Sequence, residues 1–221
     1  MSHLRGNGAT PGAYPNEQDA STLWYHDHAM GITRLNILAG LFGILTITDA
    51  ADQAHNLPGG AFDIPLVLYD RTLDCNGQLL YPVSGAPGAP FVSEFYGNAI
   101  ICNGKLFPCL DVQPRKYRFR LLNAANSSHF QLTLSGNRPF HQIASDLGLL
   151  ASPVELSTLV LFPGERAEVV IDFSGLAGRG PLCVALPSAR ARGQRDDAPL
   201  RGHQSSLDSN CFNMRASAKC R

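Results

Sequence analysis

The sequence has no run of about 18 apolar residues, the length that a helix needs to cross a membrane. We therefore expect no membrane partner. It also has no Cys-x-x-Cys pair, because its six cysteines are scattered and three of them lie after residue 180. So few well-placed thiols in 221 residues argue against a scaffold built on disulfides. The apolar residues, 44% of the chain, are numerous enough for a hydrophobic core.

The chain also has no excess of either charge, since 18 Lys and Arg balance 18 Asp and Glu. The charges are unevenly distributed: residues 179–221 carry 8 basic and 3 acidic side chains, and residues 1–178 carry 10 and 15. A shift of composition this abrupt marks a boundary. The last segment has no sustained hydrophobic period, so we expect a disordered basic tail over 179–221. Its composition favours a truncated or frame-shifted reading.

Helical periodicity is nearly absent, whereas short alternating or apolar stretches recur between turn residues. We expect strands at 39–48, 64–69, 117–121, 130–134, 141–144, 154–160 and 166–173, and hairpin turns at Asn76-Gly77 and Asn103-Gly104. Only residues 29–36 favour a short helical turn. This spacing predicts an all-β sandwich or barrel. Polar residues with Pro58-Gly59-Gly60 predict a linker over 51–62, between a first unit at 1–50 and a second at 63–178.

A basic cluster lies on the expected strand 117–121 and just before it, formed by Arg115, Lys116, Arg118 and Arg120. Arginines that alternate with Tyr117, Phe119 and Leu121 are typical of a strand with one buried and one solvated face. We therefore expect no nucleic-acid partner. Glu165 and Arg166 follow Gly164 at the entrance to another strand, where a turn or an ion pair is the expected role.

The stretch Trp24-Tyr25-His26-Asp27-His28 contains the strongest candidate site. In an extended strand, residues two apart share a face, so His26 and His28 can point at one metal ion while Asp27 faces away. Neutral imidazoles suit copper, zinc and iron, but a closed site needs three or four ligands. The other five histidines have no histidine two residues away, and we interpret them as surface or core residues: His3, His55, His129, His141 and His203.

Three long motifs resemble one enzyme family. The run PGAYPNEQDASTLWYHDHAMGITRLNILAGLFGILTITD resembles the second histidine motif of multicopper oxidases, in the branch of bacterial spore-coat laccases and bilirubin oxidases. EFYGNAIICNGKLFPCLDVQPRKYRFRLLNAANSSHFQLTLSG and LFPGERAEVVIDFSG resemble the second cupredoxin domain of that branch. The resemblance covers roughly residues 9–178.

This resemblance implies a cupredoxin-like Greek-key β-sandwich over 63–178, preceded by the last strands of a first cupredoxin-like domain. Complete members of the family oxidise a phenolic or bilin donor at a blue copper and reduce dioxygen to water at a three-copper cluster. By their position in the motif, His26 and His28 resemble ligands of the two type 3 coppers, one histidine for each. Copper is therefore the expected cofactor, and phenolic or bilin molecules and dioxygen are the expected partners.

Most of the family's ligands have no counterpart here. The cluster of the family uses four His-x-His type motifs, whereas this sequence has one, and no cysteine has the neighbouring histidine typical of the blue copper site. We expect an incomplete site with type 3 ligands only. The sequence leaves open whether the chain is a piece of a laccase-like oxidase or a non-catalytic copper-binding module. Self-association through residues 20–48 could bring two histidine pairs together as a copper or zinc site.

Overall fold

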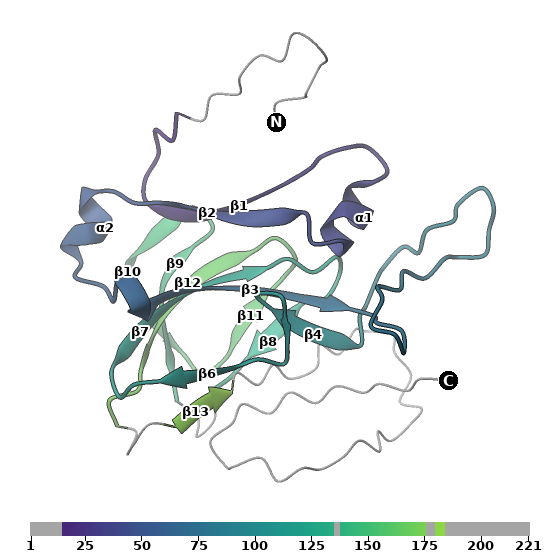
Figure 1. Ribbon diagram of the computed structural model, residues 1–221. Coiled ribbons are helices and arrows are strands. Elements are labelled where there is room, and N and C mark those ends of the chain that lie inside the picture. The colour runs from purple at the N-terminus through teal and green to yellow at the C-terminus, as the bar shows by residue number, and fades with distance from the viewer. Residues whose placement is uncertain (1–14, 135–137, 176–179, 184–221) are drawn as a thin grey trace.

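A seven-stranded sheet forms the centre of the computed structural model, which describes residues 15–134, 138–175 and 180–183 (Figure 1). Its strands follow the order β10-β9-β12-β7-β3-β4-β5, and all neighbours are antiparallel except β3 and β7. The strands are β3 Asp63–Arg71, β4 Ala99–Cys102, β5 Lys105–Leu106, β7 Lys116–Asn123, β9 Phe140–Ser145, β10 Gly148–Leu156 and β12 Arg166–Asp172. The all-β prediction is confirmed.

Three two-stranded sheets accompany the large one. They pair β1 Ser21–His26 with β2 Phe42–Ile47, β8 Phe130–Leu132 with β11 Leu159–Leu161, and β6 Cys109–Val112 with β13 Gly180–Cys183. The helical segments are short: α1 Thr33–Leu38, α2 Ala50–Ala54 and the 3₁₀ turn η1 Gly60–Phe62. None of the helices in the described ranges has the length and apolar character needed to cross a membrane.

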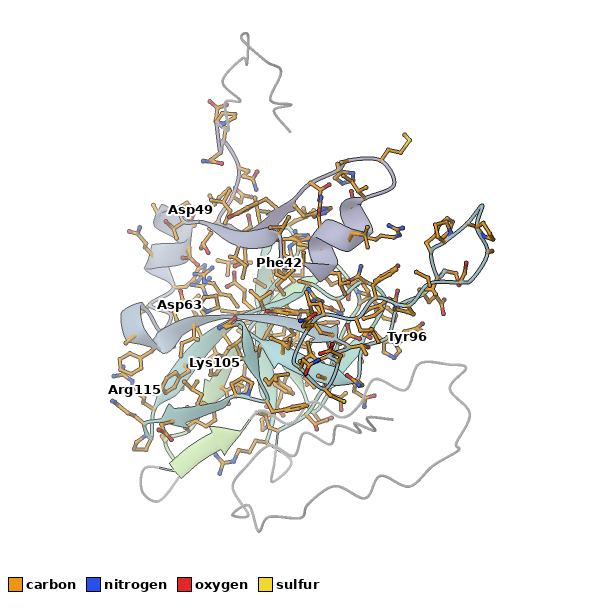
Figure 2. The ribbon with its side chains drawn as sticks, turned by 45° about the vertical axis from the view of Figure 1, so that its right-hand side comes forward. Phe42, Asp49, Asp63, Tyr96, Lys105 and Arg115 are labelled. Carbon is orange, nitrogen blue, oxygen red and sulfur yellow. The ribbon has the colours of Figure 1, made fainter. Side chains whose placement is uncertain are left out.

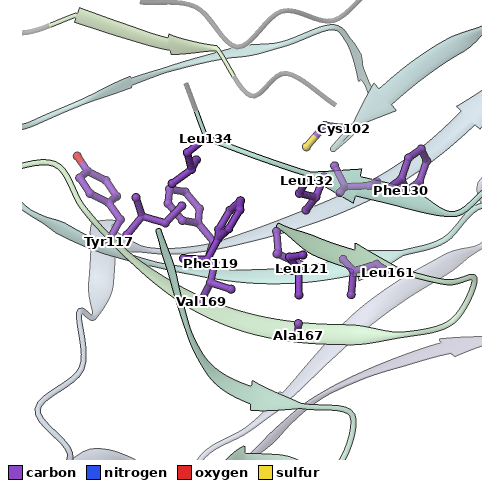
Figure 3. Close-up of a cluster of buried hydrophobic side chains, with 14 of the residues drawn as sticks. Cys102, Tyr117, Phe119, Leu121, Phe130, Leu132, Leu134, Leu161, Ala167 and Val169 are labelled. Carbon is purple, nitrogen blue, oxygen red and sulfur yellow. The ribbon is translucent and has the colours of Figure 1, made fainter. Parts of the chain in front are cut away.

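The hydrophobic core lies on one face of the large sheet (Figure 3). Alternate residues of β7 and β12 point into it, because successive side chains of a strand face opposite sides. They meet side chains from β8, β11 and β4. The core members from β7, β8 and β12 include Tyr117, Phe119, Leu121, Phe130, Leu132, Ala167, Val169 and Ile171, all of them buried. Ala167, Val169, Ile171 and Phe173 share the side that faces this core.

The opposite face of β7 is also buried, which corrects one prediction. Arg118 and Arg120 are each only 4% exposed, so this strand has no solvated face. The β1–β2 pair and α2 cover it, as Figure 1 shows at the top and the left of the view. Alternation predicted the two faces correctly but gave no information about which segment covers the charged one. Arg115 and Lys116, at the start of the strand, remain exposed.

The β1–β2 pair docks on the second unit, on the side of the sheet that carries Arg118 and Arg120. Thr22 is buried against Glu168 of β12. Phe42, labelled in Figure 2, meets the ring of Tyr69 edge-on, with 5.4 Å between centroids. The carbonyl of Ile37 in α1 accepts a hydrogen bond from Arg71 Nη2 at 2.6 Å. Both ends of the segment are therefore held to the sandwich.

The remaining local predictions have mixed outcomes. Both hairpin turns are confirmed, by the bridge between Leu73 and Leu79 and by the β4–β5 pairing. The single strand expected at 154–160 was wrong, because the ladder breaks after Leu156 and residues 159–161 pair with β8. Residues 51–62 contain α2 and η1 rather than only loop. Pairing of β13 with β6 continues regular structure to Cys183, and the rest of the expected tail lies outside the described residues.

Candidate metal centre

The two candidate ligands lie side by side where β1 ends. Their ring centroids are 5.0 Å apart, and the ring planes are inclined by 30°. Trp24, which precedes them on the same face of β1, packs on His26 with 4.4 Å between centroids. The alternation of residues predicted that both histidines lie in the strand. His26 is the last residue of β1, however, so His28 lies in the connection to α1. The two imidazole rings nevertheless lie side by side.

The ring of His26 has a defined orientation. Its Nδ1 lies 2.7 Å from the carbonyl oxygen of Asp27. A carbonyl can only accept, so in the neutral imidazole Nδ1 carries the proton and Nε2 has the lone pair. This is the arrangement of a metal-binding imidazole, in which the second nitrogen is held by a backbone acceptor. His26 is half-buried and His28 is exposed.

Asp27 turns away from the two rings toward the start of α1. Its Oδ2 accepts from the backbone N–H of Ala29 at 3.0 Å and from the hydroxyl of Thr33 at 3.3 Å. The hydrogen bond from Ala29 is the main cause that lowers the pKa of this carboxyl, which is therefore ionised at neutral pH. The alternation of the strand predicted that Asp27 faces away from the pair, but not the role of its carboxylate or of Thr33 in this turn. The available signal was an Asp just before a turn, where its side chain commonly caps backbone N–H groups.

The donor set fits part of a copper site. Two neutral imidazoles are suitable copper ligands, and the free Nε2 of His26 meets the chemical requirement. Within the described ranges, no group of three or more His, Cys, Asp or Glu side chains could hold a metal ion. His55 is exposed, and His129 stacks on Phe162, which agrees with the surface or core roles expected for them. His3 and His203 lie outside the described residues.

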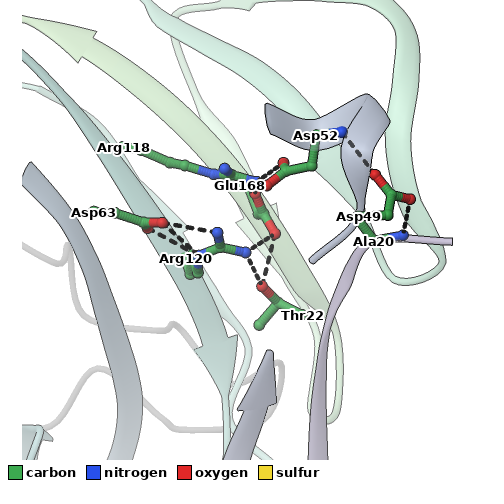
Figure 4. A network of polar contacts seen from close by, with 8 residues as sticks. All are labelled: Ala20, Thr22, Asp49, Asp52, Asp63, Arg118, Arg120 and Glu168. Atoms are coloured by element: carbon green, nitrogen blue, oxygen red, sulfur yellow. Dashed lines mark hydrogen bonds and ion pairs between the residues drawn. The ribbon is translucent and has the colours of Figure 1, made fainter. Parts of the chain in front are cut away.

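A buried charge network, which the sequence did not predict, attaches β1 to the sandwich (Figure 4). Glu168 is its centre: Oε2 accepts from Arg118 Nε at 2.7 Å, and Oε1 accepts from Arg120 Nη1 at 2.9 Å. Thr22 of β1 donates its hydroxyl to Glu168 Oε1 at 2.6 Å and accepts from Arg120 at 3.0 Å. Arg118 also binds Asp52 of α2 at 2.8 Å. The network therefore joins β1, α2, β7 and β12.

The network pairs the two arginines with three carboxylates, those of Asp52, Asp63 and Glu168. Burial disfavours the charge on Arg118, but the hydrogen bonds and the attraction of Asp52 and Glu168 outweigh it and raise its pKa. Arg120 completes its pairing with Asp63, whose Oδ2 lies 2.7 Å from Nη2. At the edge of the network, Asp49 accepts from the backbone N–H groups of Asp52 and Ala20, and these bonds lower the pKa of its carboxyl. Glu165 and Arg166 have the predicted turn and ion-pair roles, with Arg166 bound to Asp146.

Known proteins resemble both the sequence and the fold. Residues 80–179 match the family model described as multicopper oxidase. A laccase of Bacillus stratosphericus is 47% identical over 189 residues, which cover 82% of this chain and 36% of the relative. The bilirubin oxidase of Albifimbria verrucaria is 45% identical over 174 residues, covering 75% of this chain and 29% of the relative. The chain thus spans about a third of the length of the curated relatives it matches.

Solved structures agree with these relatives. The McoA multicopper oxidase of the hyperthermophile Aquifex aeolicus is similar with a TM-score of 0.66 and 34% identity, over 72% of this chain and 35% of that one. This likeness confirms the cupredoxin-like β-sandwich predicted from the motifs, and the family implies copper binding. The long motifs, the sandwich and these relatives agree on a single assignment. The chain belongs to the multicopper oxidase family.

Proposed function

We propose that this chain is part of a laccase-like or bilirubin-oxidase-like copper oxidase and that His26 and His28 contribute one imidazole to each of two type 3 coppers. The observation that carries the proposal is the pair of adjacent rings, with Nδ1 of His26 bound to a backbone carbonyl. That bond leaves Nε2 free for a metal. The other cluster ligands and the blue copper site would come from parts of a complete oxidase outside these residues.

The residues around the pair orient the imidazoles that would bind copper, and they take no part in a chemical step themselves. Trp24 packs on one side of His26, and the carbonyl of Asp27 holds its proton on Nδ1. Copper, when bound, supplies the one-electron steps by which such oxidases reduce dioxygen. Phenolic or bilin molecules are the proposed electron donors of the complete protein, by analogy with its relatives.

A second candidate is a module that binds copper without turnover. It is favoured by the absence, within the described ranges, of any cluster of three or more ligand-type side chains. Four-electron reduction of dioxygen needs more copper than one histidine pair can hold. Steady oxidation of a phenol by the pure chain, lost on His26→Ala, would exclude this second candidate.

The copper-to-chain ratio of the purified, copper-loaded chain tests the proposal by elemental analysis. We expect about one copper for one or two chains, and loss of that copper in the His26→Ala/His28→Ala variant. His55→Ala is the matched control, because His55 is an exposed histidine outside the pair. A ratio near zero, or a ratio unchanged in the double variant, contradicts the proposal.

The proposed partners include a second copy of the chain. Residues 20–48 present apolar side chains on the side away from the sandwich, among them Tyr25, Leu41 and Leu45. Association through this surface would join two copies of the chain by their β1–β2 pairs. His26 lies on the opposite face of β1, so this contact would not by itself assemble a four-imidazole site.

A further inference from the structure

We infer that Asp27 is a positioning residue for both histidines: its carboxylate closes the turn that carries His28, and its carbonyl orients the ring of His26. The inference rests on the proposed copper-binding role of the pair. It differs from that proposal because Asp27 itself does not bind the metal.

The carboxylate acts on His28. Asp27 Oδ2 accepts from the N–H of Ala29 at 3.0 Å, which closes a turn around the residue between them. Thr33 Oγ1 lies 3.3 Å from the same oxygen and 3.0 Å from the carbonyl oxygen of Ala29, and its one proton is shared among these acceptors. Since His28 is exposed and lies beyond the end of β1, no strand pairing fixes its backbone. The side chain of Asp27 supplies that restraint locally.

The carbonyl acts on His26. It lies 2.7 Å from Nδ1 of that ring and 3.3 Å from the hydroxyl of Thr33. The direction of this carbonyl depends on the backbone conformation of the turn that the Asp27 carboxylate closes. If the carbonyl moved, the hydrogen bond that favours the Nδ1–H tautomer would be lost. The ring could then rotate, and the Nε2 lone pair would no longer point in a fixed direction.

The sandwich holds this arrangement through α1, which begins at Thr33. The carbonyl of Arg34 accepts from Asn126 Nδ2 at 2.8 Å, and that of Ile37 accepts from Arg71 at 2.6 Å. Arg71 is 1% exposed, so this anchor lies within the protein. The position of Asp27 relative to the second unit is thereby defined, and with it the direction in which the two imidazoles point.

A competing explanation is electrostatic, since a carboxylate near a cation raises affinity by its charge alone. Asp27→Asn separates the two: the amide oxygen can still accept from Ala29 and Thr33, but the negative charge is gone. Asp27→Ala removes both the side-chain oxygen acceptor and the negative charge. Thr33→Ser keeps the hydroxyl and Thr33→Val removes it, which provides a second matched pair.

The experiment is a copper titration of the full chain and its variants, followed by Cu(II) electron paramagnetic resonance. Asp27→Ala is expected to weaken the affinity that depends on His26 and His28 by about 10- to 100-fold and to alter the spectrum. Asp27→Asn and Thr33→Ser are expected to resemble wild type, and Thr33→Val to resemble Asp27→Ala. Wild-type affinity in Asp27→Ala, or equal loss in Asp27→Asn, would overturn the inference and leave the copper-binding proposal standing.

A second readout uses the copper-free chain, so that the inference is tested even if copper does not bind. Nitrogen NMR of the imidazoles should report the Nδ1–H tautomer of His26 in wild type and in Asp27→Asn, and a mixture of tautomers in Asp27→Ala. Hydrogen exchange of the Ala29 amide should be slower in wild type than in Asp27→Ala. An unchanged tautomer and unchanged exchange in Asp27→Ala would refute the positioning role.

Discussion

Burial changes the chemistry of single side chains in this sandwich. Cys102 ends β4 within the hydrophobic core and is 6% exposed. Desolvation of the thiolate raises the pKa of this thiol from 9.0 to about 12. Its role is that of a small apolar core residue, not of a ligand for copper. This agrees with the absence of a histidine beside any cysteine of the chain.

The raised pKa of Cys102 predicts an inert thiol. Near pH 8 the native side chain is protonated and shielded, and only the thiolate reacts with iodoacetamide. We expect no labelling of Cys102 in the folded chain and complete labelling in denaturant, measured by mass spectrometry of its peptide. Rapid labelling under native conditions would show that β4 opens readily or that the thiol is not buried.

At the scale of elements, β1 is attached to the large sheet mainly by polar contacts. The hydroxyl of Thr22 bridges Glu168 and Arg120, and Arg166 Nε reaches the carbonyl of Thr22 at 3.1 Å. Thr22 is 1% exposed, so these bonds are made without competition from water. A short two-stranded sheet thereby gains a fixed place on the sandwich, and His26 lies on the same strand, four residues after Thr22.

Thr22→Val should weaken this attachment. The methyl group keeps the shape of the side chain but leaves Glu168 and Arg120 each without one hydrogen bond in a buried place. The expected loss is about 1–3 kcal/mol in the free energy of unfolding, measured by urea denaturation. Thr22→Ser retains the hydroxyl and is expected to lose less. Equal stability of the Val variant and wild type would mean that the hydroxyl contributes nothing to docking.

At the scale of the whole molecule, the β1–β2 pair has one covered and one open side. Thr22, Trp24 and Phe42 contact the sandwich, at Glu168, Gly164 and Tyr69 respectively. Tyr25, Leu41 and Leu45 are 64%, 61% and 40% exposed. β1 and β2 pair only with each other among the described strands, so each has an outer edge free. Such a surface favours association with another β-rich chain.

The open side predicts concentration-dependent self-association. In sedimentation velocity, the average sedimentation coefficient of the wild-type chain should rise with concentration. Leu45→Glu should weaken the association by about tenfold or more, because a charge would have to be buried. Val83→Glu is the control, since Val83 is 70% exposed in the loop between β3 and β4. A monomer at every concentration, or an equal effect of both variants, contradicts the prediction.

The sequence by itself determined the class of fold and the location of the candidate ligands. Apolar and polar residues that alternate with a period of two indicate a strand, whichever strand it pairs with. Asn-Gly turns specify hairpins locally. His26 and His28 are two residues apart, so their proximity needed no tertiary information. The long motifs carried the family assignment for the same reason, because they are continuous in the sequence.

Only the tertiary structure decided which charges are buried and what surrounds the pair. Glu168 meets Thr22 across 146 residues and Arg118 meets Asp52 across 66, and no local pattern encodes such contacts. Alternation on β7 predicted two faces, but a solvated strand face and a face covered by another segment carry the same sequence pattern. The anchoring of α1 by Arg71 was equally invisible. Whether a strand face is buried depends on which other elements pack on it, and only the tertiary structure determines that.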